Sequence, residues 1–261
     1  MLSKQTYKTP AIILSTIDYG ESDKIVSFYS ADFGKIKGIA KGAKNSRKRF
    51  ANVLEPFTQV SLIFSQRRTG MLAFIESCIA INHYGKIRSN LQATLIASYF
   101  VELTDHFTME GKASVKLFTL LSQFLSLLGC ENVNSEKLAR FFEIRLLKIM
   151  GYEPSLDKCI QCNRAIEEGT SLQFDHKGGG VRCSLCRVED STMIICSVGA
   201  LKTIIKGKEI EIEIIDRILF SQTIATECEK IMSVFIRHIL GRELRSKEVM
   251  RQIANLKATD C

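Results

Sequence analysis

The chain has 261 residues, 46% of them hydrophobic and 25% charged, with a formal net charge of +8. These proportions are those of a folded globular protein and exclude a disordered or collagen-like chain. Because no apolar run approaches the ~20 residues of a membrane span and polar sequence follows Met1 directly, we expect a cytoplasmic protein with no membrane partner.

The first eighty residues predict short β-strands separated by turns. From Val60 to Ser65 the side chains alternate with the period of two that is typical of a half-buried strand. Arg67 and Arg68, followed by Gly70, predict a hairpin loop. Several short strands in so few residues predict a closed barrel or a sandwich. The strands are expected at 11–15, 25–29, 35–40, 57–64 and 71–81.

A basic segment begins within the third expected strand and contains no acid from Lys35 to Arg49. Such a cluster attracts polyanions, and nucleic acid is favoured over a membrane surface because the segment lacks an amphipathic helix. The alternative is a solvated basic face. Phe28, Tyr29, Phe33 and Phe50 could stack on bases, although for each one core packing is the commoner role. The candidate DNA contacts are Lys35, Lys37, Lys41, Lys44, Arg47, Lys48 and Arg49, extended by Arg67 and Arg68.

From about residue 86 the hydrophobic spacing becomes helical. Apolar residues recur every third or fourth position, and Gly129, Gly151 and Gly241 stand where helices are expected to end. Ser197 is a plausible N-cap. These patterns predict an α-helical bundle. The helices are expected at 87–103, 115–128, 135–150, from 198 to about 205, at 224–239 and at 247–253.

Two C-x-x-C pairs interrupt the helical pattern. Two thiolates separated by two residues can chelate one ion from a single turn, and two such turns complete the tetrahedron of sulfurs that Zn²⁺ accepts. We therefore expect one structural zinc ion per chain, although free thiols or a redox dithiol are alternatives. His176 is a rival ligand nearby, and we assign no role to Cys78, Cys130, Cys196, Cys228 and Cys261. The predicted ligands are Cys159, Cys162, Cys183 and Cys186.

Motifs for catalysis and nucleotide binding are missing. The chain has no G-x-x-x-x-G-K-[ST], G-x-G-x-x-G or G-x-S-x-G sequence, and its four histidines show no helical i, i+4 pairing. We therefore expect that the protein is not an enzyme. Two alternatives stay open: a zinc-ribbon RNA-processing or modification enzyme, and an adaptor whose basic patch meets an acidic protein.

Several segments, in this order and spacing, resemble motifs of the bacterial recombination mediator family RecO. The resemblance covers nearly the whole chain, while Asn45 and Ser46 depart from a loop that is often richer in arginine in the family. Some members lack the cysteines, so the zinc prediction depends on the spacing in this chain. The matching segments are Gly34 to Ala43 with its A-K-G-A, Leu54–Phe57, Ala97–Leu103 with Y-x-x-E-L, Phe142–Leu147 with F-E-x-R-L-L, Gly151–Pro154 with G-Y-x-P, and Leu240–Ser246 with L-G-R-x-L-x-S.

The resemblance implies an α+β fold in which an OB-fold β-barrel at 1–82 precedes a helical domain at 83–261, with a zinc-binding insertion at about 155–190. It implies a bacterial, nucleoid-associated protein that binds single- and double-stranded DNA and anneals complementary strands without ATP. The implied partners are RecR, the acidic tail of single-strand-binding protein and, indirectly, RecA, which is loaded onto coated strands. On the helix expected at 135–150, Arg140, Arg145 and Lys148 are candidates for a groove that takes the acidic tail.

Overall fold

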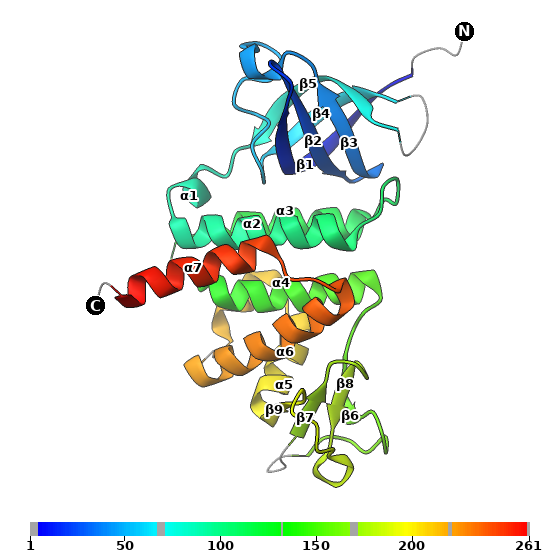
Figure 1. Cartoon of the computed structure of the whole chain (residues 1–261), viewed down its shortest axis with the longest axis vertical. Helices are drawn as coiled ribbons and strands as arrows, with labels where there is room; N and C mark the ends of the chain where they lie inside the picture. The colour runs from blue at the N-terminus through cyan, green and yellow to red at the C-terminus, as the bar shows by residue number, and fades with distance from the viewer. Residues whose placement is uncertain (1–4, 67–70, 132, 168–171, 219–220, 260–261) are drawn as a thin grey trace. The chain divides into compact units, whose positions relative to one another are not determined.

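The structure is a computed structural model that describes the chain except residues 1–4, 67–70, 132, 168–171, 219–220 and 260–261 (Figure 1). The chain divides into two compact units. Unit 1 comprises residues 1–131 and 244–261, and unit 2 comprises residues 132–243. Among the described helices, none combines the length and the apolar character that a membrane crossing requires.

Five strands of unit 1 close into a barrel, as expected from their short, alternating sequences. Their order is β1-β2-β3-β5-β4, and pairing between β1 and β4 closes the barrel. All neighbours are antiparallel except β3 and β5. This topology is that of the OB-fold, so the predicted fold class is confirmed. The strands are β1 (Thr6–Tyr19), β2 (Asp23–Ser30), β3 (Gly34–Ala40), β4 (Gln59–Ser65) and β5 (Ala73–Asn82).

The interior of the barrel contains the alternate residues of each strand. Val60, Leu62 and Phe64 point inward and are at most 1% exposed, as their period of two predicts. Gly38 of β3 allows β5 to approach closely, since a Cβ there would lie 2.3 Å from the side chain of Ile75. The inward-facing side chains of the five strands form one hydrophobic core.

Strand boundaries shift by one or more residues from the prediction, and the shifts in β1 and β4 have a clear structural cause. β1 is longer than the expected 11–15 and contains an irregularity between Ile13 and Ser15. There Ile13 donates to the carbonyl of Thr58 and accepts from the amide of Phe57. Phe57 was expected to begin a strand, but its φ of 54° places it in the left-handed region, so β4 begins at Gln59. An aromatic residue in that conformation is uncommon, and local periodicity does not reveal it.

Four helices complete unit 1. In Figure 1, α2 and α3 run side by side next to the barrel, and both contact β1. Helix α7 packs on α2, where the Glu102 carboxylate accepts hydrogen bonds of 2.9 and 2.8 Å from the amides of Arg245 and Ser246. These hydrogen bonds join two segments that resemble family motifs, namely Ala97–Leu103 and Leu240–Ser246. The helices are α1 (Gly85–Arg88), α2 (Leu91–Phe107), α3 (Val115–Leu128) and α7 (Arg245–Thr259).

Unit 2 consists of three long helices and a small sheet. Side chains of Asn134, Ser197 and Ser221 cap the helix starts, and Gly151 ends α4 with a φ of 80°. The sheet has the order β6-β8-β7-β9. Its elements in chain order are α4 (Ser135–Met150), β6 (Ser155–Cys159), β7 (Leu172–Asp175), β8 (Gly180–Arg182), η2 (Ser184–Cys186), β9 (Ile194–Cys196), α5 (Val198–Glu209), η3 (Ile212–Arg217) and α6 (Gln222–Leu240).

The barrel ends at Asn82, where we placed the domain boundary. The two units follow a different division, because α1, α2, α3 and α7 belong to the same unit as the barrel. The partition into residues 1–82 and 83–261 stays a prediction.

Candidate nucleic-acid interface and metal centre

Most of the predicted DNA contacts lie in the loop that follows β3. We call residues 41–49 the cation loop; it contains the short helix η1 (Ala43–Asn45). The loop is fixed to the turn between β1 and β2, since Gly42 donates to the Asp23 carboxylate at 2.8 Å and the amide of Lys44 donates to the Ser22 carbonyl at 2.9 Å. The hydrogen bond from Gly42 is the main reason that the pKa of Asp23 lies below its usual range. The backbone of the loop is therefore held by the barrel.

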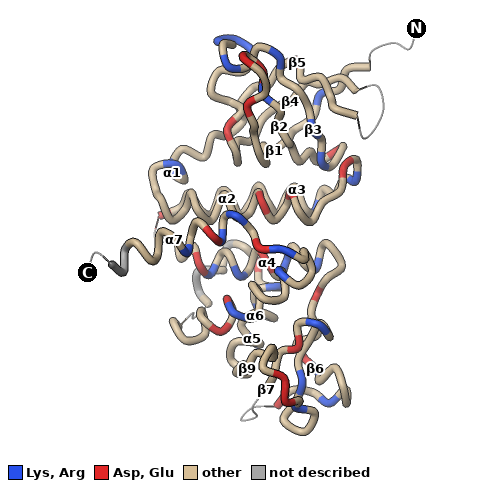
Figure 2. Tube along the Cα trace, in the orientation of Figure 1, with Lys and Arg blue, Asp and Glu red and all other residues tan. Residues whose placement is uncertain are grey.

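The loop presents its cations to solvent. Lys41, Arg47 and Lys48 are exposed, and none of them has an ion-pair partner among the residues that the structure describes. Figure 2 shows basic residues gathered at one end of the barrel. Exposed cations on a fixed backbone provide a field that attracts phosphates and neutralises them on contact.

Two other cations of the loop have structural contacts as well. The Lys44 ammonium lies 3.2 Å from the Asp18 carboxylate and donates to the Gly20 carbonyl at 3.0 Å. The Arg49 guanidinium donates to the Lys41 carbonyl at 2.9 Å and lies over the ring of Phe50. Arg49 is exposed and the Lys44 side chain keeps 26% of its surface open, so each can brace the loop and still face a ligand.

The two predicted contacts on β3 differ from those of the loop. Lys35 and Lys37 share the outer face of the strand, as expected, but Lys35 has an 11% exposed side chain whose ammonium lies 3.2 Å from the Asp105 carboxylate. The Lys37 ammonium lies 3.5 Å from Glu110 and its side chain is 50% exposed. The expectation of Lys35 as a free surface cation is wrong, because the end of α2 supplies an acid that lies 70 residues away in sequence.

The outer face of β2 and β3, which binds oligonucleotides in many OB-folds, is partly covered within unit 1. Ser27 and Lys35 both contact Asp105, and Gly111 donates to the Lys35 carbonyl at 3.1 Å. Gly34 permits this approach, because a Cβ there would lie 2.2 Å from the carbonyl oxygen of Lys112. Among the predicted DNA contacts that the structure describes, the exposed cations are consequently Lys37 and those of the cation loop.

The aromatic residues that could stack on bases lie in the core, in agreement with the commoner role. Phe28, Tyr29 and Phe50 are at most 3% exposed, and Phe33 packs against Tyr7 and Phe64. Burial raises the pKa of Tyr29 to about 12, so its hydroxyl stays neutral. Phe28 and Tyr29 offer no free face for stacking, whereas Phe33 is partly buried and Phe50, next to the cation loop, is 3% exposed. Arg67 and Arg68 lie outside the described residues.

The groove predicted on α4 is wrong in two of its three residues. Arg140 is 5% exposed, and its guanidinium lies 2.9 Å from the carboxylate of Glu143, which is fully buried. Arg145 donates to the carbonyls of Gly207, at 2.8 Å, and Ile210, so it satisfies the carbonyl end of α5. Only Lys148 is exposed. Both arginines point into unit 2 because their hydrogen-bonding partners are there.

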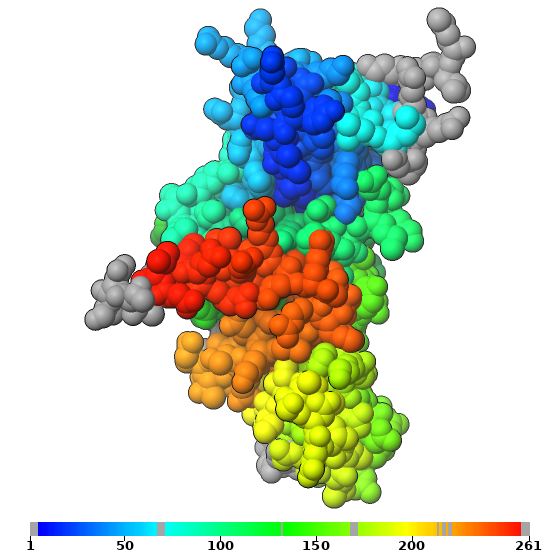
Figure 3. Space-filling view, in the orientation of Figure 1, coloured from blue at the N-terminus to red at the C-terminus, as the bar shows by residue number. Residues whose placement is uncertain are grey.

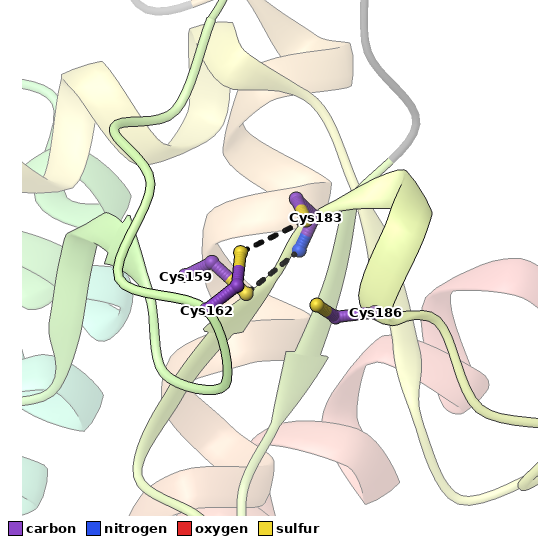
Figure 4. A group of neighbouring side chains, drawn as sticks. All are labelled: Cys159, Cys162, Cys183 and Cys186. Atoms are coloured by element: carbon purple, nitrogen blue, oxygen red, sulfur yellow. Dashed lines mark hydrogen bonds between the residues drawn. The ribbon is translucent and has the colours of Figure 1, made fainter.

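The four predicted cysteine ligands come together in unit 2 (Figure 4). Cys159 ends β6 and Cys162 lies in the turn after it, whereas Cys183 and Cys186 follow β8. The four sulfur atoms lie within 4.8 Å of one another, and those of Cys162 and Cys183 are 3.7 Å apart. Zinc–sulfur bonds of about 2.3 Å at tetrahedral angles place neighbouring sulfurs about 3.8 Å apart. The cluster could therefore hold a metal ion.

Backbone amides favour the thiolate form within this cluster. Burial raises the pKa of Cys159, but hydrogen bonds from the amides of Cys162, Cys183 and Gln161 outweigh it and bring the value to about 6. Hydrogen bonding with Cys162 and the nearby sulfurs raises the pKa of Cys186 to about 12. The pKa of Cys159 is thus lowered and that of Cys186 is raised, and a bound cation would favour the thiolate form of Cys186 as well.

The surrounding sheet holds the two cysteine turns in position. Asp175 accepts hydrogen bonds from Lys177 and Gly178 in the turn between β7 and β8, and it pairs with Arg182 at 3.0 Å. A Cβ at Gly180 would lie 2.6 Å from the Ser155 carbonyl oxygen, so the absence of a side chain at Gly180 allows β8 to pack against β6. The rival ligand His176 instead contacts the ring of His238.

The remaining cysteines behave as buried hydrophobic residues or isolated thiols. Burial raises the pKa of Cys78, Cys196 and Cys228 to about 12 in each case, which keeps these thiols protonated and unreactive. Cys130 is exposed, and Cys261 lies outside the described residues.

Sequence reasoning missed part of the surface around the cation loop. Lys24 and Lys44 both pair with Asp18, which joins the start of β2 to the loop. Tyr19 follows Asp18 at the end of β1, and it is 54% exposed. A signal was present, because an exposed aromatic beside a glycine turn is a recognisable pattern, but the pairing of β1 with β2 is needed to place it beside the loop.

Two family models match almost the whole chain, namely Recombination protein O N terminal over residues 2–84 and Recombination protein O C terminal over residues 88–248. A DNA repair protein RecO from Syntrophus aciditrophicus is 45% identical over 258 residues, which are 98% of this chain and 99% of the relative. Proteins of the same name from Desulfatibacillum aliphaticivorans and Syntrophobacter fumaroxidans are 31% and 34% identical over 248 residues, covering 94% and 95% of this chain and 96% and 98% of theirs. The chain belongs to the RecO family of DNA repair proteins.

Proposed function

We propose that the protein is a mediator of DNA repair and homologous recombination that binds single- and double-stranded DNA through the cation loop. The observation that carries the proposal is the exposure of Lys41, Arg47 and Lys48 on a backbone fixed to a five-stranded barrel. Lys44 and Arg49 add charge from the same loop, and Lys37 is half exposed beside it in sequence. Lys35 acts in this account by holding the barrel to α2.

Charge-based binding is suited to strand annealing without ATP. Two complementary strands repel each other, and cations that neutralise both backbones lower that repulsion while leaving the bases free to pair. Such a reaction requires no bond-making residue, so the protein acts without catalysis. Membership of a DNA repair family supports this account over an RNA-modifying enzyme or a general adaptor.

The wider role is to act with RecR and load RecA onto strands coated by single-strand-binding protein, in the bacterial cytoplasm at the nucleoid. Contact with the acidic tail of the coating protein requires exposed cations beside apolar surface. On α4, Lys148 is the exposed cation, since Arg140 and Arg145 have partners inside unit 2. Other exposed cations of the protein therefore have to contribute to binding the acidic tail.

Titration of a fluorescent single-stranded oligonucleotide at several salt concentrations tests DNA binding. The logarithm of the affinity falls linearly with the logarithm of the salt concentration, because each phosphate contact releases counterions. Reversing Lys41, Arg47 and Lys48 to glutamate abolishes binding at moderate salt, and the matched control reverses the exposed helical residues Lys116, Lys206 and Lys230. Equal losses in both variants would mean that only the net charge matters and that the loop is not the site.

The metal of the cysteine cluster is one structural zinc ion per chain. Four sulfur ligands leave no open position for a substrate, which is the arrangement of structural zinc sites. Elemental analysis of the purified protein gives one zinc, and Cys162→Ser removes it and lowers the thermal stability of unit 2, since metal binding is coupled to local folding. Cys130→Ser is the control, because Cys130 is an exposed, isolated thiol. A metal-free protein with unchanged melting contradicts the assignment.

A further inference from the structure

The end of the barrel beside the cation loop contains a hollow of about 310 Å³. The loop that joins β3 to β4 forms most of its wall, and Figure 3 shows side chains of this mid-blue part of the chain standing out from the barrel surface. Mouths of β-barrels are common ligand sites, and pockets for small ligands begin at about 300 Å³. The hollow is therefore large enough for a small planar group.

Apolar side chains close the bottom of the hollow, while polar atoms make up most of its exposed surface. Ala43, Phe50 and Leu54 line it, and each is at most 7% exposed and belongs to the barrel core. A flat group with weakly hydrated faces and polar edges suits such a mixed surface. The hydrophobic effect thus acts at the same place where the loop concentrates its charge.

The rim of the hollow is mainly cationic. Lys24, Lys44 and Arg47 line it, and Glu55 is the single acid among the lining residues. Lys24 and Lys44 share Asp18, whereas Arg47 has no ion pair among the described residues. Buried apolar side chains below a cationic rim match a group that joins a ring to a phosphate.

The wall is fixed by contacts along its whole length. Thr16 donates to the Leu54 carbonyl at 2.5 Å, Cys78 donates to the Arg49 carbonyl at 3.2 Å, and Phe57 donates to the Ile13 carbonyl at 2.7 Å. Asn52 in the wall and Phe57 at its end have φ values of 53° and 54°, which are conformations that persist where the surroundings enforce them. Because the hollow is pre-organised, binding does not have to order it.

We propose that this hollow receives one unpaired nucleobase of a bound DNA strand while Arg47 contacts the adjoining phosphate. This inference rests on the proposed DNA binding and adds to it the source of a preference for single strands. A base in a duplex is stacked and paired and cannot enter, whereas a base of a single strand leaves its neighbours at small cost. The protein then binds single strands at the hollow and the loop, and duplexes at the loop alone.

Filling the hollow tests the proposal. Ala51 is exposed on its wall, so Ala51→Leu narrows the hollow without removing a charge. We expect about a tenfold loss of affinity for single strands, the effect of one lost base contact, and no change for duplexes of equal length. Ala254→Leu on α7 is the control, since Ala254 is also exposed and is not among the lining residues.

Two further oligonucleotides separate this proposal from the proposed function. A strand with 2-aminopurine at each position in turn reports entry of a base as a rise in fluorescence, which Ala51→Leu removes. An abasic strand binds wild type and Ala51→Leu equally. If Ala51→Leu binds single strands as wild type does, or weakens single strands and duplexes alike, the hollow is not a base site. Loss of all binding by the loop variant with normal binding by Ala51→Leu overturns the hollow alone, whereas salt-independent binding overturns the proposed function.

Discussion

The cation loop and helix α4 are both rich in lysine and arginine, yet they use these residues in opposite ways. In the loop, Lys41, Arg47 and Lys48 face solvent. In α4, Arg140 and Arg145 point inward, the first to a buried carboxylate and the second to helix carbonyls. The cause lies in the surrounding groups. Residues 35–49 contain no acid, and the loop is anchored mainly through its backbone, whereas α4 supplies Glu143 one turn after Arg140. The function of a basic segment thus depends on which acceptors lie opposite it.

The largest expected effect is at the buried ion pair of α4. Arg140→Met leaves the Glu143 carboxylate in an interior from which water is excluded, and we expect a loss of about 3–5 kcal/mol in the free energy of unfolding. Urea denaturation of unit 2 measures this loss. DNA affinity of the folded variant stays at the wild-type value, because Arg140 is not on the surface.

The double variant Arg140→Met with Glu143→Leu provides the control for that loss. Replacing both charges removes the unpaired carboxylate, so most of the stability returns. If Arg140→Met has wild-type stability, or if weaker DNA binding is its only defect, Arg140 acts as a surface cation like those of the cation loop.

A smaller effect is expected where Arg145 meets the end of α5. Arg145→Ala removes hydrogen bonds from a charged donor to the carbonyls of Gly207 and Ile210, and we expect a loss of about 2 kcal/mol. Hydrogen exchange of the amides in the last turn of α5 is the measurement, with Lys148→Ala as the control for an exposed residue of the same helix. Unchanged exchange rates would mean that Arg145 is dispensable for the fold.

The contrast between buried and exposed charge also applies to an acid, Glu102. Burial raises the pKa of this carboxyl, but hydrogen bonds from His106, Ser246 and Arg245 outweigh it and lower the value from 4.5 to about 2. A group with a depressed pKa stabilises the fold above the pKa of the unfolded chain, so this contribution is full above pH 4.5 and is lost as the pH falls towards 2.

Glu102→Gln is expected to cost about 1–2 kcal/mol at neutral pH, because an amide oxygen accepts the helix amides of α7 less strongly than a carboxylate does. Urea midpoints measured from pH 7 to pH 2 check this, and the difference between variant and wild type shrinks in the acid range. Parallel curves over the whole range would show that the carboxylate of Glu102 does not stabilise α7.

The smallest effect distinguishes two lysines that were predicted to act alike. Lys35→Met is expected to lower stability by about 1 kcal/mol and leave DNA affinity unchanged, since its ammonium is held by Asp105. Lys41→Met is expected to leave stability unchanged and to reduce the salt dependence of DNA binding by about one phosphate contact. Paired melting curves and salt titrations measure both. If the two variants lose DNA affinity equally, the face of β3 belongs to the interface.

Much of the fold follows from local patterns in the chain. Alternation in 60–65 and the spacing of apolar residues in 115–128 predicted β4 and α3, and Gly151 marked the end of α4. The cysteine cluster was also predictable, because each C-x-x-C pair is local and only their meeting is long-range. These features depend on neighbours within a few positions.

The surface was harder to predict, because partners distant in sequence determine it. Lys35 meets an acid 70 residues later, and Arg145 meets a carbonyl 62 residues later. The hollow combines side chains from β2 and from the loop after β3, which no periodicity brings together. For the same reason, the density of positive charge in a segment predicts nucleic-acid binding in general, but it does not show which of its side chains are exposed.

Helix α7 has a consequence for how the protein is made. Its first amides are bound by Glu102, 143 residues earlier in the chain, and α7 belongs to the same compact unit as the barrel. On the ribosome, residues 132–243 emerge before α7 does, so unit 2 can fold while α2 still lacks the helix that packs on it. A messenger truncated shortly before codon 244 would therefore yield a chain with an intact cysteine cluster and an α2 that lacks its contact with α7, so unit 1 is completed only after unit 2 has been synthesised.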